Sequence, residues 1–265
     1  MRKFYEGPRL TRNLTQGSII NHCLADNYND VEDIYGFIIT PRCDLAHESK
    51  VTHVHYLPVV DFKDWIEHDG KDYLFNKWLR KKKEKFESKC KVYQIPMSHF
   101  SYSHYEKMAN TLICNKSDKD DFLSLALIVT NPLKDNSEFL SHINKRDIKT
   151  QLVKDLLEDK IAAFYLIEDW EKNTNNHKVI LLRELKRISI LTTQKFYHGL
   201  CLSEIIEGKD ELKKTSDSED LCQVCAQIAS PFVEHIMQRF SHNFCRIGVD
   251  DRDIEVEKEA LLKQL

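Results

Sequence analysis

Two β-rich regions lie far apart along the chain, and this spacing constrains the fold more than any other feature of the sequence. Residues 17–24, 35–43 and 51–62 are rich in β-branched and aromatic side chains, and clusters of Asn, Asp, Pro and Ser bound them, as is typical of strands. The next such stretches, 162–170 and 178–190, flank a polar segment that predicts a hairpin loop. We therefore expect one small barrel or sheet that is completed by both halves of the chain.

The segment between the two β-rich regions has a mainly helical pattern. Residues 74–89 and 144–161 favour helices, whereas residues 122–132 fit either a helix or a buried strand. The predicted fold class is α+β, in a single composite domain. This domain comprises a β core of residues 1–62 and 162–192, a mainly helical insertion of residues 63–161, a C-terminal helical part of residues 193–249 and an acidic tail of residues 250–265.

An amphipathic helix is predicted near the C-terminus. Ser230 is placed as its N-cap, Pro231 suits the first helical position, and Gly248 suits the C-terminal cap. Apolar side chains recur between them at helical spacing, which predicts a helix packed on the core. This apolar stripe consists of Phe232, Val233, Ile236, Met237, Phe240, Phe244 and Ile247.

The composition indicates a globular protein with reduced cysteines. The 265 residues carry a formal net charge of -3, which argues against a surface that is basic throughout but allows a local basic patch. No apolar run reaches the roughly 18 to 20 residues of a membrane span, and the N-terminus lacks the apolar region of a signal peptide. We therefore expect a cytoplasmic protein without membrane contact, whose cysteines are free thiols, metal ligands or reactive groups.

Reactive side chains are concentrated after the second predicted strand. Cys43, His47, His53 and His55 are side chains that zinc accepts as ligands, and the last two would share one face of a strand. The sequence therefore predicts a zinc site here as one possibility. Because the spacing matches no standard zinc pattern, the alternative is a strand and a turn that carry histidines without a metal.

Cys43 and Asp44 have two further interpretations. In the first, Cys43 is a nucleophile beside Arg42, which would lower the pKa of the thiol, and Asp44 orients His47 or caps the following turn. In the second, Cys43 packs inward, and Asp44 accepts hydrogen bonds from backbone amides in the turn. In the second interpretation, neither side chain has a catalytic or metal-binding role.

A Cys-x-x-Cys pair, Cys222 and Cys225, lies in a stretch that favours a helix. Together with His242 and Cys245 it would form a zinc site, provided that the helices fold back on one another. The alternative is a pair of core cysteines one helical turn apart.

A basic stretch with interleaved aromatic residues lies in the predicted helical insertion. Its lysines and arginines would neutralise phosphates, and its aromatic faces would stack on unpaired bases. The alternative is a solvated helix face that Trp78 and neighbouring apolar residues anchor to the core. The residues predicted to bind nucleic acid or a partner protein are Trp78, Arg80, Lys81, Lys82, Lys83 and Lys85.

A polar stripe is predicted on the C-terminal helix, away from its apolar face. His235, Arg239, His242 and Arg246 recur there at helical spacing. Such a stripe would hold a phosphate or pair with a carboxylate from elsewhere, or it is simply a solvated face. In an enzyme, groups for acid–base chemistry must lie within hydrogen-bond reach. The candidate catalytic residues are Cys43, Asp44, Arg239, His242 and Arg246.

The motifs of the common nucleotide-binding and hydrolytic enzymes are missing. The sequence contains no GxxxxGK[ST], GxGxxG, GxSxG or HExxH pattern. Its few glycines leave little material for phosphate-binding loops. These absences argue against an ATPase, a Rossmann enzyme and a zincin, and we expect no nucleoside triphosphate as a ligand.

Two segments resemble a group of uncharacterised bacterial proteins. These proteins pair an I-[ST]-x-x-CDL segment with a later SP...QRF...F.R.G helix, and the chain matches them with GFIITPRCDLA and SPFVEHIMQRFSHNFCRIG. Proteins of this kind tend to occur in mobile-element and phage-defence neighbourhoods, so the resemblance implies a role there. The barrel-like ends also resemble, at the level of the fold alone, SH3-like toxin barrels that bind or cut RNA. The matching residues are Cys43, Asp44, Leu45, Ser230, Pro231, Gln238, Arg239, Phe240, Arg246 and Gly248.

The leading hypothesis is a non-enzymatic binding or adaptor component of an anti-phage defence or mobile-element system. In it, an SH3-like barrel around Cys43 and Asp44 packs on the C-terminal helix, and the helical insertion engages nucleic acid or another protein of the same system. One rival is a nuclease or toxin-like enzyme that uses the candidate catalytic residues. The other rival is a structural module stabilised by zinc, whereas the leading hypothesis requires no cofactor.

Overall fold

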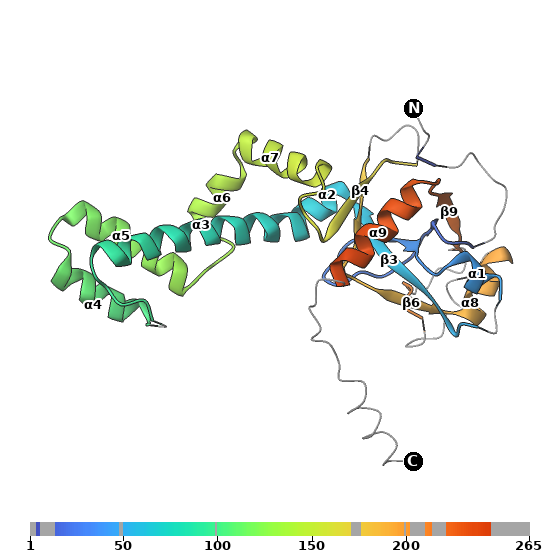
Figure 1. The fold of residues 1–265 in the computed structure, drawn as a ribbon, viewed down its shortest axis with the longest axis horizontal. Coiled ribbons are helices and arrows are strands. Elements are labelled where there is room, and N and C mark those ends of the chain that lie inside the picture. The colour runs from blue at the N-terminus through green and yellow to red at the C-terminus, as the bar shows by residue number, and fades with distance from the viewer. Residues whose placement is uncertain are drawn as a thin grey trace, which may run out of the picture. The chain divides into compact units, whose positions relative to one another are not determined.

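The chain mixes helices with an antiparallel sheet, in agreement with the predicted α+β class (Figure 1). It divides into two compact units, one of residues 1–62 and 161–265 and one of residues 63–160. We call the first the sheet unit and the second the helical unit. The structure is a computed structural model that describes residues 4–5, 14–47, 50–98, 100–170, 176–198, 200–201, 210–213 and 221–244.

Among the described residues, the sheet unit contains a seven-stranded antiparallel sheet to which both ends of the chain contribute. The strand order is β4-β5-β3-β2-β1-β9, and β6 also pairs with β3, so that the sheet curls into a half-barrel. The strands are β1 (Ser18–Ile20), β2 (Tyr35–Ile38), β3 (His53–Asp61), β4 (Phe164–Ile167), β5 (Lys178–Leu181), β6 (Lys186–Ser189) and β9 (Val224–Gln227).

The second β-rich region forms a hairpin followed by a further strand. β4 and β5 pair antiparallel, with Ile167 opposite Lys178, which confirms the predicted hairpin. The stretch 178–190 is not one strand, however, because a turn at residues 182–185 separates β5 from β6. β5 pairs with the C-terminal end of β3, and β6 pairs with its N-terminal end. The long strand β3 therefore connects two parts of the curled sheet.

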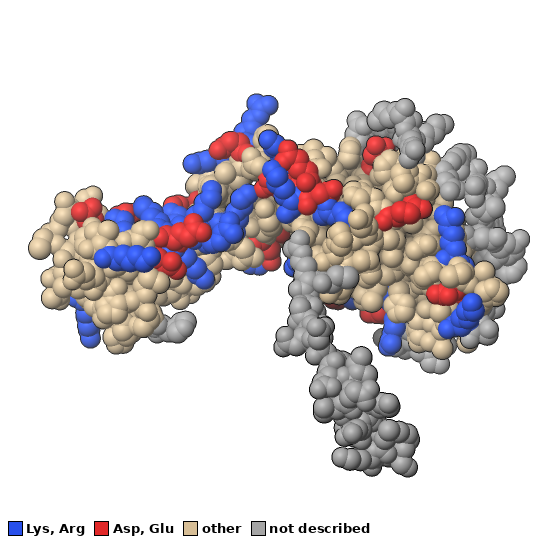
Figure 2. All heavy atoms as spheres, in the orientation of Figure 1, with Lys and Arg blue, Asp and Glu red and all other residues tan. Residues whose placement is uncertain are grey.

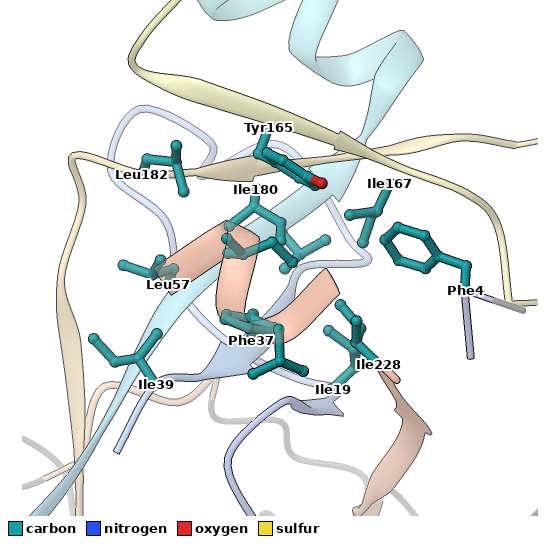
Figure 3. Close-up of a cluster of buried hydrophobic side chains, with 13 residues drawn as sticks. Phe4, Ile19, Phe37, Ile39, Leu57, Tyr165, Ile167, Ile180, Leu182 and Ile228 are labelled. Atoms are coloured by element: carbon teal, nitrogen blue, oxygen red, sulfur yellow. The ribbon is translucent and has the colours of Figure 1, made fainter. Parts of the chain in front are cut away.

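A cluster of buried apolar side chains holds the sheet together (Figure 3). Ile19, Phe37 and Leu57 lie directly opposite one another on β1, β2 and β3, and all three are fully buried. Val233 and Ile236 of helix α9 (Phe232–Phe244) belong to the same cluster. Burial of each such side chain stabilises the fold by about 1.5–3 kcal/mol. Helix α9 is therefore docked on the sheet by its apolar face, as its spacing predicts.

The N-terminal end of α9 differs slightly from the prediction. The helix begins at Phe232 rather than at Pro231, and the bond between Ser230 and Pro231 is cis. The amides of Phe232 and Val233 donate to the carbonyl oxygen of Ala229. Gly248, the predicted C-terminal cap, and the predicted tail of residues 250–265 lie outside the described residues.

The prediction of a helical part over residues 193–249 is wrong for residues 200–201, 221–222 and 224–227, which form strands. After the short helices α8 (Ile190–Gln194) and η2 (Lys195–His198), the described residues form β7 (Leu200–Cys201), β8 (Leu221–Cys222) and β9. β7 pairs with β8, and β9 pairs with β1. Cys222 and Cys225 therefore lie on strands and not on a helix. So short an apolar run does not distinguish a helix from a strand, and the hydrogen bonds that decide for a strand come from β7 and from the distant strand β1.

The helical unit is organised around the long helix α3. Helix α5 packs along both α3 and α4, and α6 packs on α3. Residues 122–132, which fit a helix or a strand in sequence, fall mostly in α5. No helix formed by the described residues of the chain is long and apolar enough to cross a membrane. The elements are α2 (Phe62–Trp65), η1 (Ile66–Gly70), α3 (Lys71–Val92), α4 (Tyr102–Leu112), α5 (Lys116–Thr130), α6 (Ser137–Ile143) and α7 (Arg146–Leu157).

Candidate functional site

Cys43 and Asp44 lie in α1 (Arg42–Leu45), the short helix that follows β2. The Cys43 side chain is exposed, so the prediction that it packs inward is wrong. Its Sγ lies 3.5 Å from Asp44 Oδ1, and Asp44 is half-buried. The thiol thus contacts a carboxylate rather than a histidine, which is not the arrangement of an activated nucleophile.

The predicted zinc ligands near Cys43 are not gathered around one point. His47 is exposed after α1, whereas His53 and His55 lie half-buried on the same face of β3. Burial, followed by the positive charges of His53 and Arg187, lowers the pKa of His55. Within the described residues, no three His, Cys, Asp or Glu side chains are arranged to hold a metal ion.

The stripe on α9 serves mainly to attach this helix to β4. Arg239 Nη2 donates to the carbonyl oxygens of Ile161, at 3.3 Å, and Phe164, at 3.4 Å. Asn243 Nδ2 donates to the carbonyl oxygen of Ala162, at 3.0 Å. β4 is the last strand of the sheet, so these side chains satisfy carbonyl groups at the start of its open edge.

The remaining residues of the stripe have different surroundings. The ring Nδ1 of exposed His235 lies 3.0 Å from the hydroxyl of buried Tyr165, and His242 is exposed. Arg246 lies outside the described residues. Helices α1 and α9 are separated in Figure 1, and the contacts above do not bring Asp44 to Arg239. Among its described members, the predicted catalytic cluster is therefore not assembled.

The Cys-x-x-Cys pair meets a third cysteine that sequence reasoning missed. Cys222 is buried, and its Sγ donates to the carbonyl oxygen of Asn21 at 3.3 Å. The Sγ of Cys23, also buried, donates to the same oxygen at 3.7 Å. Cys225 is exposed. Of the other predicted zinc ligands, Cys245 lies outside the described residues, so this zinc site stays a prediction.

Trp78 does not present its ring to a nucleic acid. The side chain is 4% exposed, and its ring centroid lies 5.9 Å from that of Phe75 and 5.5 Å from that of Phe139. A base needs an open aromatic face for stacking. The prediction that Trp78 binds nucleic acid is therefore wrong, and its anchoring role is the correct alternative.

Most of the predicted basic residues on α3 already have acidic partners. Figure 2 shows Asp and Glu side chains among the Lys and Arg side chains over the helical unit. Lys81 and Lys83 are exposed and form no ion pair with any residue that the structure describes. The ion pairs on this helix are Lys77 with Asp155, Arg80 with Glu84, Lys82 with Glu138, Lys85 with Asp121 and Lys89 with Asp121.

A basic surface forms where α3 meets the end of α6. The ion pair between Lys82 and Glu138 joins the two helices, and His142 lies one turn after Glu138 on the same face of α6. Burial, followed by the positive charges of Lys145 and Lys81, lowers the pKa of His142. We call Lys81, Lys82, His142 and Lys145 the basic surface.

A second feature absent from the predictions is a buried lysine between two aromatic rings. Lys178 Nζ lies 4.8 Å from the ring centroids of both Tyr35 and Trp170. It forms an ion pair with Asp61, directly opposite on β3. All four residues lie in segments predicted as β structure, but only the strand register shows that they meet. The ammonium group of Lys178 therefore has its partners within the protein and is not available to bind a ligand.

Comparison with known proteins adds no assignment. No family model matches the chain, and searches of curated proteins and of solved structures gave no match. Of the sites described above, the basic surface has two exposed lysines, Lys81 and Lys145, that form no ion pair with any described residue.

Proposed function

We propose that the protein is a binding component that engages the phosphates of a nucleic acid through the basic surface of its helical unit. The observation that supports the proposal most directly is the position of Lys81 and Lys145. Both are exposed, both lie close enough to His142 to lower its pKa, and neither forms an ion pair within the described part of the chain. Cations without an acidic partner attract phosphate groups.

The character of the surface limits the kind of recognition. Because Trp78 is buried, no stacking on bases is expected from it, and binding through lysines alone is directed to the phosphate backbone. Such binding is insensitive to sequence and weakens steeply as salt is added. Asp147 also lies near His142 and opposes the positive potential, so a modest affinity is expected.

The wider setting of the protein belongs to the same proposal. The half-barrel of the sheet unit is proposed to be SH3-like, and the protein to act as an adaptor in an anti-phage defence or mobile-element system. The support for the first is the curled half-barrel of the sheet, and the support for the second is the resemblance carried by GFIITPRCDLA and SPFVEHIMQRFSHNFCRIG. In this arrangement the sheet unit would contact other proteins of the system while the helical unit engages nucleic acid.

Fluorescence anisotropy with labelled single-stranded DNA, duplex DNA and RNA tests the binding role. The Lys81→Glu/Lys145→Glu variant reverses two charges of the basic surface. The matched control is Lys107→Glu/Lys116→Glu, which makes the same charge change at exposed positions on α4 and α5. We expect the first variant to lose about tenfold or more in affinity and its salt slope to fall by about two, while the control keeps both.

Two results would refute the proposal. The first is a wild-type protein that binds none of the three nucleic acids at low salt. The second is an equal loss of affinity in both charge-reversal variants, since that would reflect net charge and not the basic surface.

A further inference from the structure

Cys23 lies near Cys222 and Cys225, which come from a segment far away in the sequence, and, besides burial, the charge of Cys225 contributes to a raised pKa of both other thiols. The thiols of Cys23 and Cys222 donate to the same oxygen, the carbonyl of Asn21, at 3.7 and 3.3 Å. The two sulfur atoms are therefore at most about 7 Å apart. Neither side chain has any exposed surface. Cys225, three residues after Cys222, is exposed to solvent.

The backbone around these thiols has special features that position them. His22 has a φ of 55°, in the left-handed region, so the chain turns between the end of β1 at Ile20 and Cys23. On the other side, the pairing of β1 with β9 shifts register between Ile19 and Ile20, which leaves Cys225 as the extra residue of a β-bulge. Bulges change the direction of a side chain and often lie beside functional sites.

Space for the buried thiol depends on a glycine in the neighbouring strand. A Cβ at Gly36 of β2 would lie 2.6 Å from Cys23 Sγ and 2.8 Å from the ring of Tyr56. The position thus admits Cys23 only because residue 36 carries no side chain. The thiol is enclosed between Gly36, Tyr56 and the Asn21 carbonyl.

The arrangement favours pairwise thiol chemistry over metal binding. The three sulfur atoms do not belong to any group of three ligands arranged for a metal ion among the described residues. Two of them nevertheless share one hydrogen-bond acceptor, which keeps their sulfur atoms within about 7 Å, so that a disulfide requires these side chains to move toward each other. Burial raises the pKa of Cys23 and of Cys222 well above the ordinary value, so neither is the first to react.

We propose that Cys225, Cys222 and Cys23 form a thiol relay that is oxidised by peroxides and ends in a disulfide between Cys23 and Cys222. Cys225, as thiolate, attacks the peroxide oxygen, which gives a sulfenic acid and releases hydroxide. The Cys222 sulfur then attacks the Cys225 sulfur, and the sulfenic hydroxyl leaves as water with the Cys222 proton. Finally the Cys23 sulfur attacks Cys222 and releases Cys225, which takes up the Cys23 proton. In total, two thiols and one hydrogen peroxide give one disulfide and two waters.

Because Cys225 is exposed, it is the thiol that peroxide reaches first. Because Cys23 and Cys222 are buried, the disulfide between them is protected from reductants in the solvent. A disulfide between Cys23 and Cys222 would connect the segment after β1 to β8 and close a long loop, which stabilises the folded chain. The relay is independent of the proposed binding of nucleic acid, since its residues lie in the sheet unit.

The test is disulfide mapping of the full chain after treatment with hydrogen peroxide. Remaining thiols are blocked with N-ethylmaleimide, and the unreduced peptides are identified by mass spectrometry. We expect a linked pair of peptides that contain Cys23 and Cys222. The Cys225→Ser variant should form this link at least about tenfold more slowly, and the Cys43→Ser and Cys114→Ser variants, which remove other exposed thiols, should form it at the wild-type rate.

Two further variants separate the steps. Cys23→Ser should stop the relay at the disulfide between Cys222 and Cys225, and Cys222→Ser should leave a sulfenic acid on Cys225 that dimedone labels. Cys23→Ala replaces Cys23→Ser if the hydroxyl impairs folding. The proposal is overturned if peroxide modifies Cys43, Cys114 and Cys225 alike while Cys23 and Cys222 stay reduced in the wild-type protein.

Discussion

The ammonium group of Lys178 forms a buried ion pair with the carboxylate of Asp61, the residue directly opposite it in the sheet. The two side chains are 4% and 21% exposed. Asn176 Nδ2 donates to the second carboxylate oxygen of Asp61 at 2.6 Å, and the rings of Tyr35 and Trp170 cover the ammonium group. Both charges are thus satisfied inside the protein, which makes the pair sensitive to the loss of either partner.

Replacement of Lys178 by Met should lower the free energy of unfolding by about 3 kcal/mol, because Asp61 would keep its charge without a cation. The double variant Lys178→Met/Asp61→Leu should cost less than the single change, since no charge remains buried. Urea denaturation followed by tryptophan fluorescence measures both. Lys50→Met, at an exposed position, is the control, and a loss of stability equal to that of Lys178→Met would contradict the structural role of the pair.

Much of the β structure could be predicted because its signal is local. Residues 162–170 and 178–190 show β-branched runs around a polar loop, and β4 and β5 do form a hairpin there. The segment around Cys222 and Cys225 has no such signal. Its strands exist because β1 and β7 pair with them, and a sequence window cannot show a partner that lies far away in the chain.

The candidate sites were harder to predict than the strands, since they depend on which side chains meet. The basic pattern of α3 is visible in the sequence, but the burial of Trp78 follows from its packing on Phe139 of α6. Arg239 stood out as a possible catalytic group, yet its partners are backbone carbonyls, which leave no trace in a sequence. Spacing identifies residues on one face of an element, and only the tertiary contacts show what that face touches.

Arg239 should contribute to stability and His242 should not. Arg239→Ala removes the donor to the carbonyl oxygens of Ile161 and Phe164 and the contact of the guanidinium group with the Tyr165 ring, so we expect a loss of about 1.5–3 kcal/mol. His242→Ala, at an exposed position of the same helix, should change stability by less than about 0.5 kcal/mol. Equal effects in chemical denaturation would mean that α9 is not attached to β4 through Arg239.

The stability of the helical unit should depend on pH through Asp155. Burial alone would raise the pKa of this carboxyl, but hydrogen bonds from Lys77 and Gln151 outweigh that effect and hold the pKa below its ordinary value. A lowered folded-state pKa stabilises the folded state above the unfolded pKa, about 3.9. This stability is lost as the pH falls through the lower folded value.

Asp155→Asn tests this dependence. The variant should be less stable than the wild type by about 1–3 kcal/mol at neutral pH, and the difference should shrink as the pH falls below the ordinary carboxyl range. Asp120→Asn, at an exposed position on α5, should show no such pH-dependent difference. Unfolding curves over a pH series measure all three proteins, and a constant difference between wild type and Asp155→Asn would rule out the carboxylate as the cause.

Trp78 should matter for folding and not for binding. Trp78→Phe keeps an aromatic ring in the cluster with Phe75 and Phe139 and should leave the affinity for nucleic acid unchanged, because the ring has no open face. Trp78→Ala should lower stability by about 3–5 kcal/mol through the cavity that it creates. Anisotropy and denaturation measurements separate the two effects. A folded Trp78→Phe variant with weakened binding would show that the ring does reach the nucleic acid.

Gly36→Ala tests whether this glycine makes room for Cys23. The new Cβ would lie 2.6 Å from Cys23 Sγ and 2.8 Å from the Tyr56 ring, so the variant should lose about 1–3 kcal/mol of stability. In the Cys23→Ala background the clash with the thiol is absent. Gly36→Ala should therefore cost less stability in that background than in the wild-type protein. If Gly36→Ala costs the same stability in both backgrounds, the thiol is able to move aside without cost. Of the two neighbours, only the Tyr56 ring would then require a glycine at this position.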